Sequence, residues 1–325
     1  MKKIVAILSG DPNSINSEII AKTWNKRKKL LNIDFFVIGN FLLLSKQFSK
    51  MGYKVNIKKL EKFEFKNFRK NLYVLDIPLE FKKPFDVNKK LRKKYIKKSF
   101  DIAIDLIRKK NVFGLVNCAI NKKDLFSEKK YSGVTEYLSK RLGFLGKEAM
   151  LIYNKSLTVS PITTHIKLRD VVKKINKKII ISKATTINDF FKKKLKIKPK
   201  IGILGLNPHN DEYRKKSEEN KIIIPAIKTL KKKGIKVFGP ISPDTAFINF
   251  KKNKFNVFVG MYHDQVLTPF KSIFKFDAIN ITAGLPFLRI SPDHGIGKEI
   301  IMKNKADPKS LINSINFFKK INAQT

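Results

Sequence analysis

Short apolar runs alternate with longer segments of helical periodicity in the first part of the chain. The strand-like runs are rich in Ile, Val and Phe and lie at 3–8, 31–40, 54–57 and 114–116. Apolar residues recur at helical spacing at 17–31 and 88–110. This alternation predicts a mostly parallel sheet covered by helices, which is an α/β fold. No Gly-x-Gly-x-x-Gly follows the first strand, which argues against a Rossmann nucleotide site.

Two further apolar runs end in clusters of polar residues. Val257-Phe258-Val259 has the character of a buried strand, and the polar segment 262–265 follows it. The second run, 278–282, leads to Arg289 and then to residues 291–295. The carboxyl ends of strands in α/β sheets are where ligands usually bind. The pattern is therefore typical of an active site.

The chain contains four histidines, which are His165, His209, His263 and His294. The first three lie in loops that follow short apolar runs, so they occupy comparable strand ends. Neutral imidazole is a good ligand for zinc, cobalt and similar ions, and three such loops indicate a metal site. A lone histidine is more often an ordinary core or surface residue, and spacing alone leaves both interpretations open.

Composition agrees with a globular protein and excludes several other classes. With 325 residues and 42% hydrophobic content the chain can bury a large core. No apolar run approaches the roughly 18 residues that a membrane span needs, and the first one is too short for a signal peptide. The single cysteine, Cys118, excludes an internal disulfide and fits a reducing compartment. We therefore expect a cytoplasmic protein that has no membrane partner.

The formal net charge of +44 raises the question of a polyanion partner. The lysines are scattered through every segment, and no recognised nucleic-acid module or aromatic–basic repeat is present. Abundant Ile, Asn and Phe accompany them, as in a drift toward AT-rich codons. We therefore interpret the charge as solvated lysine faces and expect no nucleic-acid partner, although the charge would attract an anionic substrate.

Nine short motifs, spread over the whole chain, occur in an order that resembles one known family. They are Gly10-Asp11-Pro12, Ala119-Ile120-Asn121-Lys122, Gly133 with Thr135-Glu136, Thr164-His165, Gly205-Leu206-Asn207-Pro208-His209, Pro243-Asp244-Thr245, Tyr262-His263-Asp264-Gln265, Gly284-Leu285-Pro286-Phe287 with Arg289, and Ser291 with Asp293-His294-Gly295. The chain resembles the 4-hydroxythreonine-4-phosphate dehydrogenase family of pyridoxal phosphate (vitamin B6) biosynthesis, which is similar to isocitrate and isopropylmalate dehydrogenases.

The resemblance implies a fold and an assembly. It implies two α/β/α domains of the isocitrate/isopropylmalate dehydrogenase-like type, with a non-Rossmann dinucleotide site. Residues 1–130 and 285–325 would form a nucleotide-associated domain, and residues 131–284 a domain for metal, substrate and dimerisation. The active site would lie at the interface of a homodimer, with histidines drawn from both subunits.

The resemblance also implies roles for individual residues. The ligands of a divalent metal ion (Zn, Mg or Co) would be His165, His209 and His263. The substrate-binding residues would be Thr135, Lys271, Asn280 and Arg289. The residues associated with NAD or NADP would be Gly10, Asp11, Asp293, His294 and Gly295. The candidate catalytic residues are Asp244, Asp264 and Lys271, of which the two aspartates would transfer protons or support the histidines.

The function expected from this resemblance is NAD-dependent, divalent-metal-dependent oxidation and decarboxylation of 4-phosphooxy-L-threonine. One departure bears on the substrate, because the family usually has Gly-His-Thr-Glu where this chain has Gly133-Val134-Thr135-Glu136. Val134 thus replaces a substrate-binding histidine. The alternatives are the same chemistry on another phosphorylated hydroxy acid, such as a phosphothreonate or a phosphoerythronate, or a non-catalytic relative that binds polyanions.

Overall fold

A computed structural model of the chain describes residues 4–30, 33–125, 133–248, 250–275 and 277–321. The chain divides into two compact units, which are residues 1–128 with 287–325 (unit 1) and residues 129–286 (unit 2). The boundary expected after residue 130 lies outside the described residues, and the one expected after residue 284 differs from this division by two residues. The functional roles given to the two parts remain predictions.

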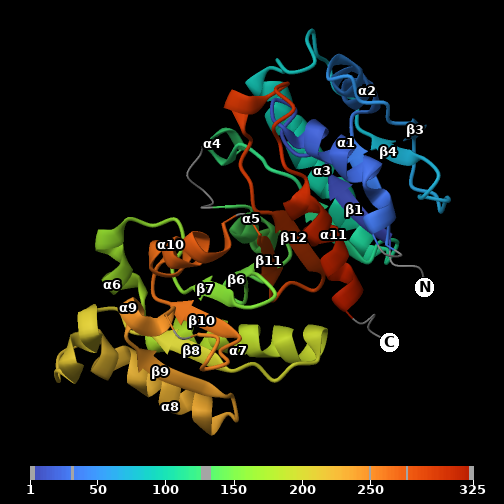
Figure 1. Ribbon diagram of the computed structural model, residues 1–325. Coiled ribbons are helices and arrows are strands. Elements are labelled where there is room, and N and C mark those ends of the chain that lie inside the picture. Colours follow the sequence, from blue (N-terminus) through green and yellow to red (C-terminus); the bar gives the residue numbers. More distant parts are fainter. Residues whose placement is uncertain (1–3, 31–32, 126–132, 249, 276, 322–325) are drawn as a thin grey trace. The chain divides into compact units, whose positions relative to one another are not determined.

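Unit 1 is built on a parallel sheet with the strand order β3-β4-β2-β1-β5-β12. Strands β1, β3, β4 and β12 of this sheet are labelled in Figure 1. Its strands are β1 (Ile4–Leu8), β2 (Asp34–Gly39), β3 (Ile57–Leu60), β4 (Leu72–Asp76), β5 (Gly114–Asn117) and β12 (Leu288–Pro292). Its helical elements are α1 (Asn16–Asn25), η1 (Arg27–Lys29), α2 (Phe41–Lys50), α3 (Lys89–Arg108), α4 (Lys122–Leu125), η6 (Lys298–Ile300) and α11 (Lys309–Lys320).

The central strands of unit 1 are covered by helices on both faces. Every residue of β1 and β2 is buried, and successive side chains of a strand point to opposite faces of the sheet. Helix α3 packs on β1 and β2, whereas α1 contacts α2 and α11. Tyr95 ties α3 to the ends of β1 and β2, because its hydroxyl lies 2.7 Å from Ser9 Oγ and accepts the Asn40 N–H at 3.0 Å.

Most elements expected in unit 1 are present, with shifted ends. The strands expected at 3–8, 31–40 and 114–116 correspond to β1, β2 and β5, and the helix expected at 88–110 is α3. The position predicted for the third strand, 54–57, is wrong, since β3 begins at Ile57, where the predicted strand ends. The chain leaves α2 through Gly52, whose φ is +74°, and the Tyr53 N–H still donates to the Phe48 carbonyl. Pairing with β4 therefore starts only at Ile57.

Unit 2 is built on a mixed sheet with the strand order β11-β6-β7-β10-β8-β9. Its strands are β6 (Ala149–Tyr153), β7 (Thr158–Pro161), β8 (Ile201–Leu204), β9 (Val237–Ile241), β10 (Val257–Gly260) and β11 (Ile279–Ala283). Its helical elements are α5 (Val134–Arg141), η2 (Leu168–Asp170), α6 (Val171–Lys174), α7 (Lys177–Phe190), η3 (Phe191–Leu195), η4 (Pro208–Tyr213), η5 (Glu219–Ile223), α8 (Ile224–Lys232), α9 (Pro243–Ala246) and α10 (His263–Phe274). Strands β7, β10, β8 and β9 are parallel, and β6 is antiparallel to both β11 and β7.

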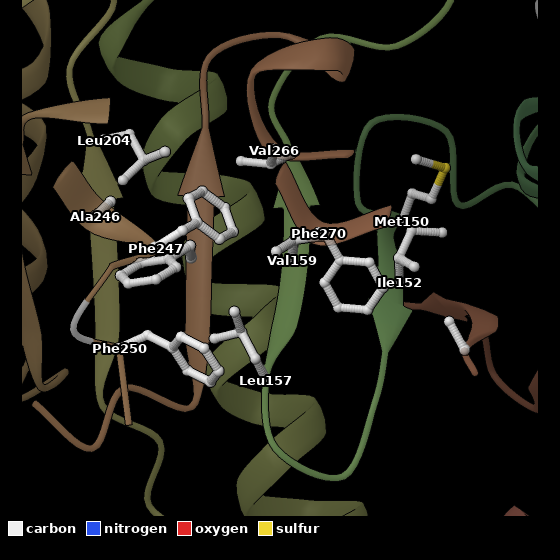
Figure 2. Close-up of a cluster of buried hydrophobic side chains, with 12 residues drawn as sticks. Met150, Ile152, Leu157, Val159, Leu204, Ala246, Phe247, Phe250, Val266 and Phe270 are labelled. Carbon is white, nitrogen blue, oxygen red and sulfur yellow. The ribbon is translucent and has the colours of Figure 1, made fainter. Parts of the chain in front are cut away.

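An apolar cluster fixes α10 on the sheet of unit 2 (Figure 2). Val266 and Phe270 of α10 are fully buried and belong to one cluster with Val159 of β7. Burial of each such side chain stabilises the fold by roughly 1.5–3 kcal/mol relative to its exposure. Because α10 begins at His263, this packing also holds the first residue of the helix in place.

Within the parts of the chain that the structure describes, no helix combines the length and apolar character needed to cross a lipid bilayer.

Candidate metal and substrate site

Three of the four histidines follow neighbouring parallel strands of unit 2. Strand β10 pairs with β7 on one side and with β8 on the other, so all three strands end at the same edge of the sheet. His165 follows β7, His263 follows β10 and His209 follows β8. The expectation that these histidines occupy comparable strand ends is confirmed. Such an edge is where open α/β sheets bind ligands.

Side chains tie these strand-end loops to one another. Gln265 Nε2 donates to the Gly205 carbonyl at 2.8 Å, and Gln265 Oε1 accepts the Met261 N–H at 2.7 Å. Thr163 Oγ1 donates to the Met261 carbonyl at 2.7 Å. The loops after β7, β10 and β8 are thus cross-linked by hydrogen bonds. The sequence showed Gln265 only as one member of a polar cluster and did not reveal this role.

His165 and His263 face each other within unit 2. Their ring centroids are 5.5 Å apart, with an angle of 38° between the ring planes. His263 Nδ1 lies 2.6 Å from Asp264 Oδ1. When Nδ1–H donates to this carboxylate, the lone pair of Nε2 is available to a metal ion, and the ring orientation is fixed. Asp264, predicted for proton transfer or histidine support, is in the position required for support.

Gly133 and Glu136 form the surroundings of His165. A Cβ atom at Gly133 would lie 3.7 Å from His165 Cδ2 and 3.0 Å from Glu136 Oε2, so glycine leaves room for both side chains. Thr164 Oγ1 donates to Glu136 Oε1 at 3.2 Å, which links the turn of His165 to α5. Glu136 was only part of a motif in the sequence, and its place beside His165 could not be read from that.

His209 lies in a turn of unusual backbone conformation. Residues 209–213 all have φ between +47° and +59°, although none of them is glycine. The left-handed conformation costs an ordinary residue roughly 1–2 kcal/mol, so surrounding groups must hold this turn. Element η4, which contains the turn, contacts α9, where Asp244 is located. The hydroxyl of Ser242 donates to Asp244 at 2.7 Å and lowers the pKa of that carboxyl, with a smaller contribution from His209.

The chemistry of His165 and His263 is compatible with a divalent ion, for which the two would be a pair of ligands. His165 and His263 offer facing imidazoles, one of them oriented by a carboxylate, as in protein sites for zinc and related ions. Across the described ranges, no group of three or more His, Cys, Asp or Glu side chains is placed to hold a metal ion. His209 is therefore at the same sheet edge but outside the facing pair.

Two of the substrate candidates in unit 2, Thr135 of α5 and Asn280 of β11, are linked through Thr282 of β11. Thr135 Oγ1 lies 3.2 Å from Thr282 Oγ1, and Thr282 and Asn280 point to the same face of the strand because they are two residues apart. Asn280 Oδ1 is buried and accepts no hydrogen bond from the described residues. A buried acceptor of this kind is suited to a hydroxyl or amine of a ligand. Lys271, the third candidate, lies two turns beyond Asp264 on α10.

The position of the missing family histidine is buried in the core. Val134 is the first residue of α5, and its side chain is 5% exposed. Its neighbours in the sequence, Gly133 and Thr135, take part in the surroundings of His165 and of Asn280. The Val134 side chain thus belongs to the buried core, although its two neighbours in the sequence belong to the candidate site.

The remaining substrate candidate, Arg289, is a strand residue of unit 1. It lies on β12, is 3% exposed and donates from Nε to Asn117 Oδ1 at 2.6 Å. Asn117 is the last residue of β5, the neighbouring strand. A buried guanidinium held in this way offers a fixed planar donor group. The part of Asn117 in holding it was not seen in the sequence.

The nucleotide candidates lie in two adjoining turns of unit 1. The Ile15 N–H donates to the Ile296 carbonyl at 3.0 Å, which joins the turn after β1 to the turn after β12. Asp11 is 2% exposed, accepts the Asn13 N–H at 2.9 Å and lies 3.3 Å from Arg92 Nη1. A Cβ atom at Gly10 would lie 2.5 Å from the Ala119 carbonyl, so only glycine fits there.

His294 lies in the second of these turns, between Asp293 and Gly295. Its Nδ1 is 2.8 Å from the Gly295 carbonyl, and burial lowers the pKa of the imidazole. Its Nε2 is buried and has no hydrogen-bond partner in the described part of the chain. His294 belongs to unit 1, whereas the other three histidines belong to unit 2.

Comparison with known proteins places this arrangement in a family. The family described as "Pyridoxal phosphate biosynthetic protein PdxA" matches residues 32–318. A protein of Sulfurihydrogenibium sp. named 4-hydroxythreonine-4-phosphate dehydrogenase is 43% identical over 319 residues, which cover 96% of each chain. The chain belongs to the PdxA family. The family recognised from the sequence motifs is thereby confirmed.

A further relative and a solved structure are also similar to this chain over almost its whole length. A protein of Salmonella typhimurium named D-threonate 4-phosphate dehydrogenase is 32% identical over 96% of this chain and 97% of its own. The crystal structure of a 4-hydroxythreonine-4-phosphate dehydrogenase from Klebsiella pneumoniae superposes with a TM-score of 0.83 at 29% identity, covering 97% of this chain and 98% of the other. The names of the relatives confirm the prediction of an oxidoreductase.

The fold class predicted from the sequence is also confirmed. An isocitrate dehydrogenase from Methylococcus capsulatus, only 11% identical, has a TM-score of 0.50 over 96% of this chain and 83% of its own. At that identity the likeness concerns the fold alone. It agrees with the α/β, isocitrate dehydrogenase-like architecture of the PdxA family member.

Proposed function

We propose that this protein is an NAD-dependent, divalent-metal-dependent dehydrogenase that oxidises and decarboxylates 4-phosphooxy-L-threonine in pyridoxal phosphate biosynthesis. The observation that carries the proposal is the facing pair His165 and His263, with Asp264 at His263 Nδ1, in a chain similar over its whole length to proteins named for this activity. NADP as the nucleotide is the alternative, and Zn, Mg and Co are the metals we consider.

The proposed chemistry assigns a task to each group of unit 2. The neutral imidazoles of His165, His209 and His263 would hold a divalent ion, which would supply Lewis acidity toward substrate oxygens during oxidation and decarboxylation. Asp264 holds the His263 ring and Glu136 holds the turn of His165. Asp244, whose carboxyl has a lowered pKa, is ionised near neutral pH, which makes it a weak proton acceptor but suits it to support His209 on the neighbouring η4.

Further polar groups of the chain are assigned to the substrate. Asn280 Oδ1, buried and without a partner among the described residues, would accept a hydrogen bond from a substrate hydroxyl or amine. Lys271 supplies a cation for the phosphate, and Thr135 a hydroxyl. For Arg289 the proposal rests on the family resemblance and on its fixed, buried guanidinium. Gly10, Asp11 and residues 293–295 are proposed for the nucleotide on the same resemblance.

A homodimer with a shared active site is part of the proposal. Ile166, Leu168 and Val172 follow His165 directly and are exposed in the single chain, Leu168 by 68%. Exposed apolar side chains in one segment are typical of a protein–protein interface. A second copy bound there would cover them and bring its own histidines near the first. We further propose the cytoplasm as the compartment, because the single cysteine is buried and unpaired.

The test is an assay of NADH formation with 4-phosphooxy-L-threonine, with and without a chelator, with light scattering of the same sample. We expect turnover that the chelator abolishes and that added Zn²⁺ or Co²⁺ restores, from a dimer. Turnover by a stable monomer would contradict the shared site. No turnover together with tight, salt-sensitive binding of nucleic acid would favour a non-catalytic polyanion-binding protein.

D-Threonate 4-phosphate is the second candidate substrate. Relatives named for it are similar over almost the whole chain, and Val134 replaces the family histidine in a buried position. The same assay with this acid distinguishes the two substrates. A kcat/KM at least about tenfold higher for D-threonate 4-phosphate, equivalent to about 1.4 kcal/mol, would make it the preferred substrate.

A further inference from the structure

The left-handed turn that carries His209 is held by two consecutive residues of another element. These are Glu219 and Asn220, the first residues of η5, a single π-helical turn. Glu219 is hydrogen-bonded to the residues before the turn, and Asn220 is hydrogen-bonded to the residues at its end. Neither residue was singled out in the sequence, although Glu218 and Glu219 form an acidic pair in a chain with 70 basic and 26 acidic residues.

Glu219 fixes the entry to the turn. Its Oε1 accepts the Leu206 N–H at 2.7 Å and the Asn207 N–H at 2.9 Å, and its Oε2 accepts from Asn207 Nδ2 at 3.1 Å. The side chain is fully buried. Burial alone raises the pKa of Glu219, but the hydrogen bonds from Asn207 and Leu206 outweigh it and hold the pKa below its usual range. The buried group is therefore an ionised carboxylate that accepts three hydrogen bonds.

Asn220 fixes the exit from the turn. Its Nδ2 donates to the Tyr213 carbonyl and, at 3.0 Å, to the Arg214 carbonyl. The chemistry of the two residues is complementary, because a carboxylate accepts the N–H groups at the start and an amide donates to the carbonyl groups at the end. Both act from one helical turn, so the distance between entry and exit is set by rigid backbone.

The inside of the turn is filled by Asn210. Its Nδ2 donates to Tyr213 Oη at 3.2 Å and lies 3.4 Å from the Pro240 carbonyl. A Cβ atom at Gly205 would clash with Asn210 Oδ1, so glycine at that position gives the side chain room. With the inside packed and both ends bonded, the left-handed form is held in spite of its cost for residues with a Cβ atom.

We propose that Glu219 and Asn220 are positioning residues that hold the left-handed turn and thereby direct the His209 imidazole toward the metal ion. This inference rests on the proposed function in one respect, that His209 is a metal ligand. Residues that orient a ligand typically change metal affinity about 10- to 100-fold when they are replaced. The proposal adds to the site two side chains that touch neither substrate nor metal.

The test uses the full-length protein and three substitutions. Glu219→Gln keeps the shape but removes the charge and sets a donor against the Asn207 amide, and Asn220→Ala removes the exit bonds. The matched control is Glu212→Gln, since Glu212 lies in the same turn but its carboxylate is exposed and pairs with Arg214. Two quantities are measured, which are the hydrogen–deuterium exchange of residues 206–214 without metal and the affinity for Co²⁺ by titration.

We expect faster exchange at 206–214 in both variants, with Co²⁺ affinity about 10- to 100-fold lower, while the control stays like the wild type. Saturating Co²⁺ should restore kcat in both, because the ligands remain, but not in His209→Ala. A merely structural role would change thermal stability without changing Co²⁺ affinity. If Glu219→Gln does not fold, Asn220→Ala decides by the same two measurements, because its side chain is partly exposed.

Wild-type exchange and wild-type Co²⁺ affinity in both variants would overturn the proposal. Failure of the proposed function has a different signature, which is a His209→Ala protein that binds Co²⁺ as tightly as the wild type. That result would remove the ligand role of His209. The hold of Glu219 and Asn220 on the turn would then be decided by the exchange rates alone, since they are measured without metal.

Discussion

The strand-end turns of the two units contain polar residues of the same kinds but use them differently. In unit 1 the Asp11 carboxylate is buried, accepts a hydrogen bond from its own turn and pairs with Arg92. In unit 2 the rings of His165 and His263 face each other, and separate carboxylates hold them or their turns. The motif carboxylate thus builds its own turn in unit 1, whereas in unit 2 the motif carboxylates Asp264 and Glu136 hold the motif histidines or their turns. A family motif alone does not distinguish these two uses.

The largest effect is expected for the histidines of unit 2, which are proposed to bind the metal ion. His263→Ala should abolish bound divalent metal and lower kcat/KM by more than about 100-fold, beyond the usual effect of residues that only support a ligand. His294→Ala is the control in unit 1 and should leave metal content intact. Metal content is measured by atomic emission and kcat/KM by NADH absorbance. Full metal occupancy in His263→Ala would remove this histidine from the ligand set.

A loss of stability is expected for Asp11 of unit 1, whose carboxylate holds its own turn. Asp11→Asn should lower the free energy of unfolding by about 1.5–3 kcal/mol, because hydrogen bonds to a charged group are weakened. The control is Asp105→Asn, whose exposed pair with Lys109 on α3 should contribute at most about 0.5 kcal/mol. Both are measured by urea unfolding. Unchanged stability together with weaker NAD binding would instead make Asp11 a nucleotide ligand.

A smaller effect on catalysis is expected for Asn280, whose buried Oδ1 accepts no hydrogen bond from the described residues. Asn280→Ala should raise KM by up to about 10-fold, since a neutral hydrogen bond contributes about 0.5–1.5 kcal/mol. Stability should change little, because no intramolecular bond of Oδ1 is lost. The matched change Asn154→Ala removes a bonded amide in the same unit and should affect stability without affecting KM. The opposite pattern at Asn280 would contradict a substrate role.

The sequence predicted what depends on periodicity and on motif order, and little of what depends on long-range contacts. Strands β1, β2, β5 and β10 and helix α3 follow from apolar spacing, and the three histidines follow from their place after strands. The partners Asn117, Glu136 and Glu219 could not be found in this way. Asn117 meets Arg289 across 172 positions of the chain, and only the folded sheet brings the two together.

Val134 tests how far a family motif decides the substrate. Val134→His places a polar ring where the side chain is 5% exposed, so some stability should be lost through an unpaired buried group. We expect kcat/KM for 4-phosphooxy-L-threonine to change by no more than ~10-fold, because the other residues proposed to bind it, Thr135, Lys271 and Asn280, are unchanged. Val134→Leu, measured in parallel, separates the effect of size from that of polarity. A gain of several hundredfold from a poor wild type would mean that the natural substrate is another acid.

The smallest effect is expected at Cys118, which follows β5 in unit 1 and is fully buried. Burial raises the pKa of this thiol to about 12, whereas a thiol in the unfolded chain has a pKa of about 8.5. Between these values the folded state binds the proton and the unfolded state releases it, so stability is complete below pH 8.5 and falls as the pH rises. The loss from this group between pH 7 and pH 9 should be about 0.8 kcal/mol. Urea unfolding at both pH values should show this extra loss in the wild type relative to Cys118→Ala. Equal losses in the two proteins would mean that the Cys118 thiol ionises in the folded state as it does in the unfolded chain. The end of β5 would then be accessible to solvent, in contrast to the buried carboxylate of Asp11 in the same unit.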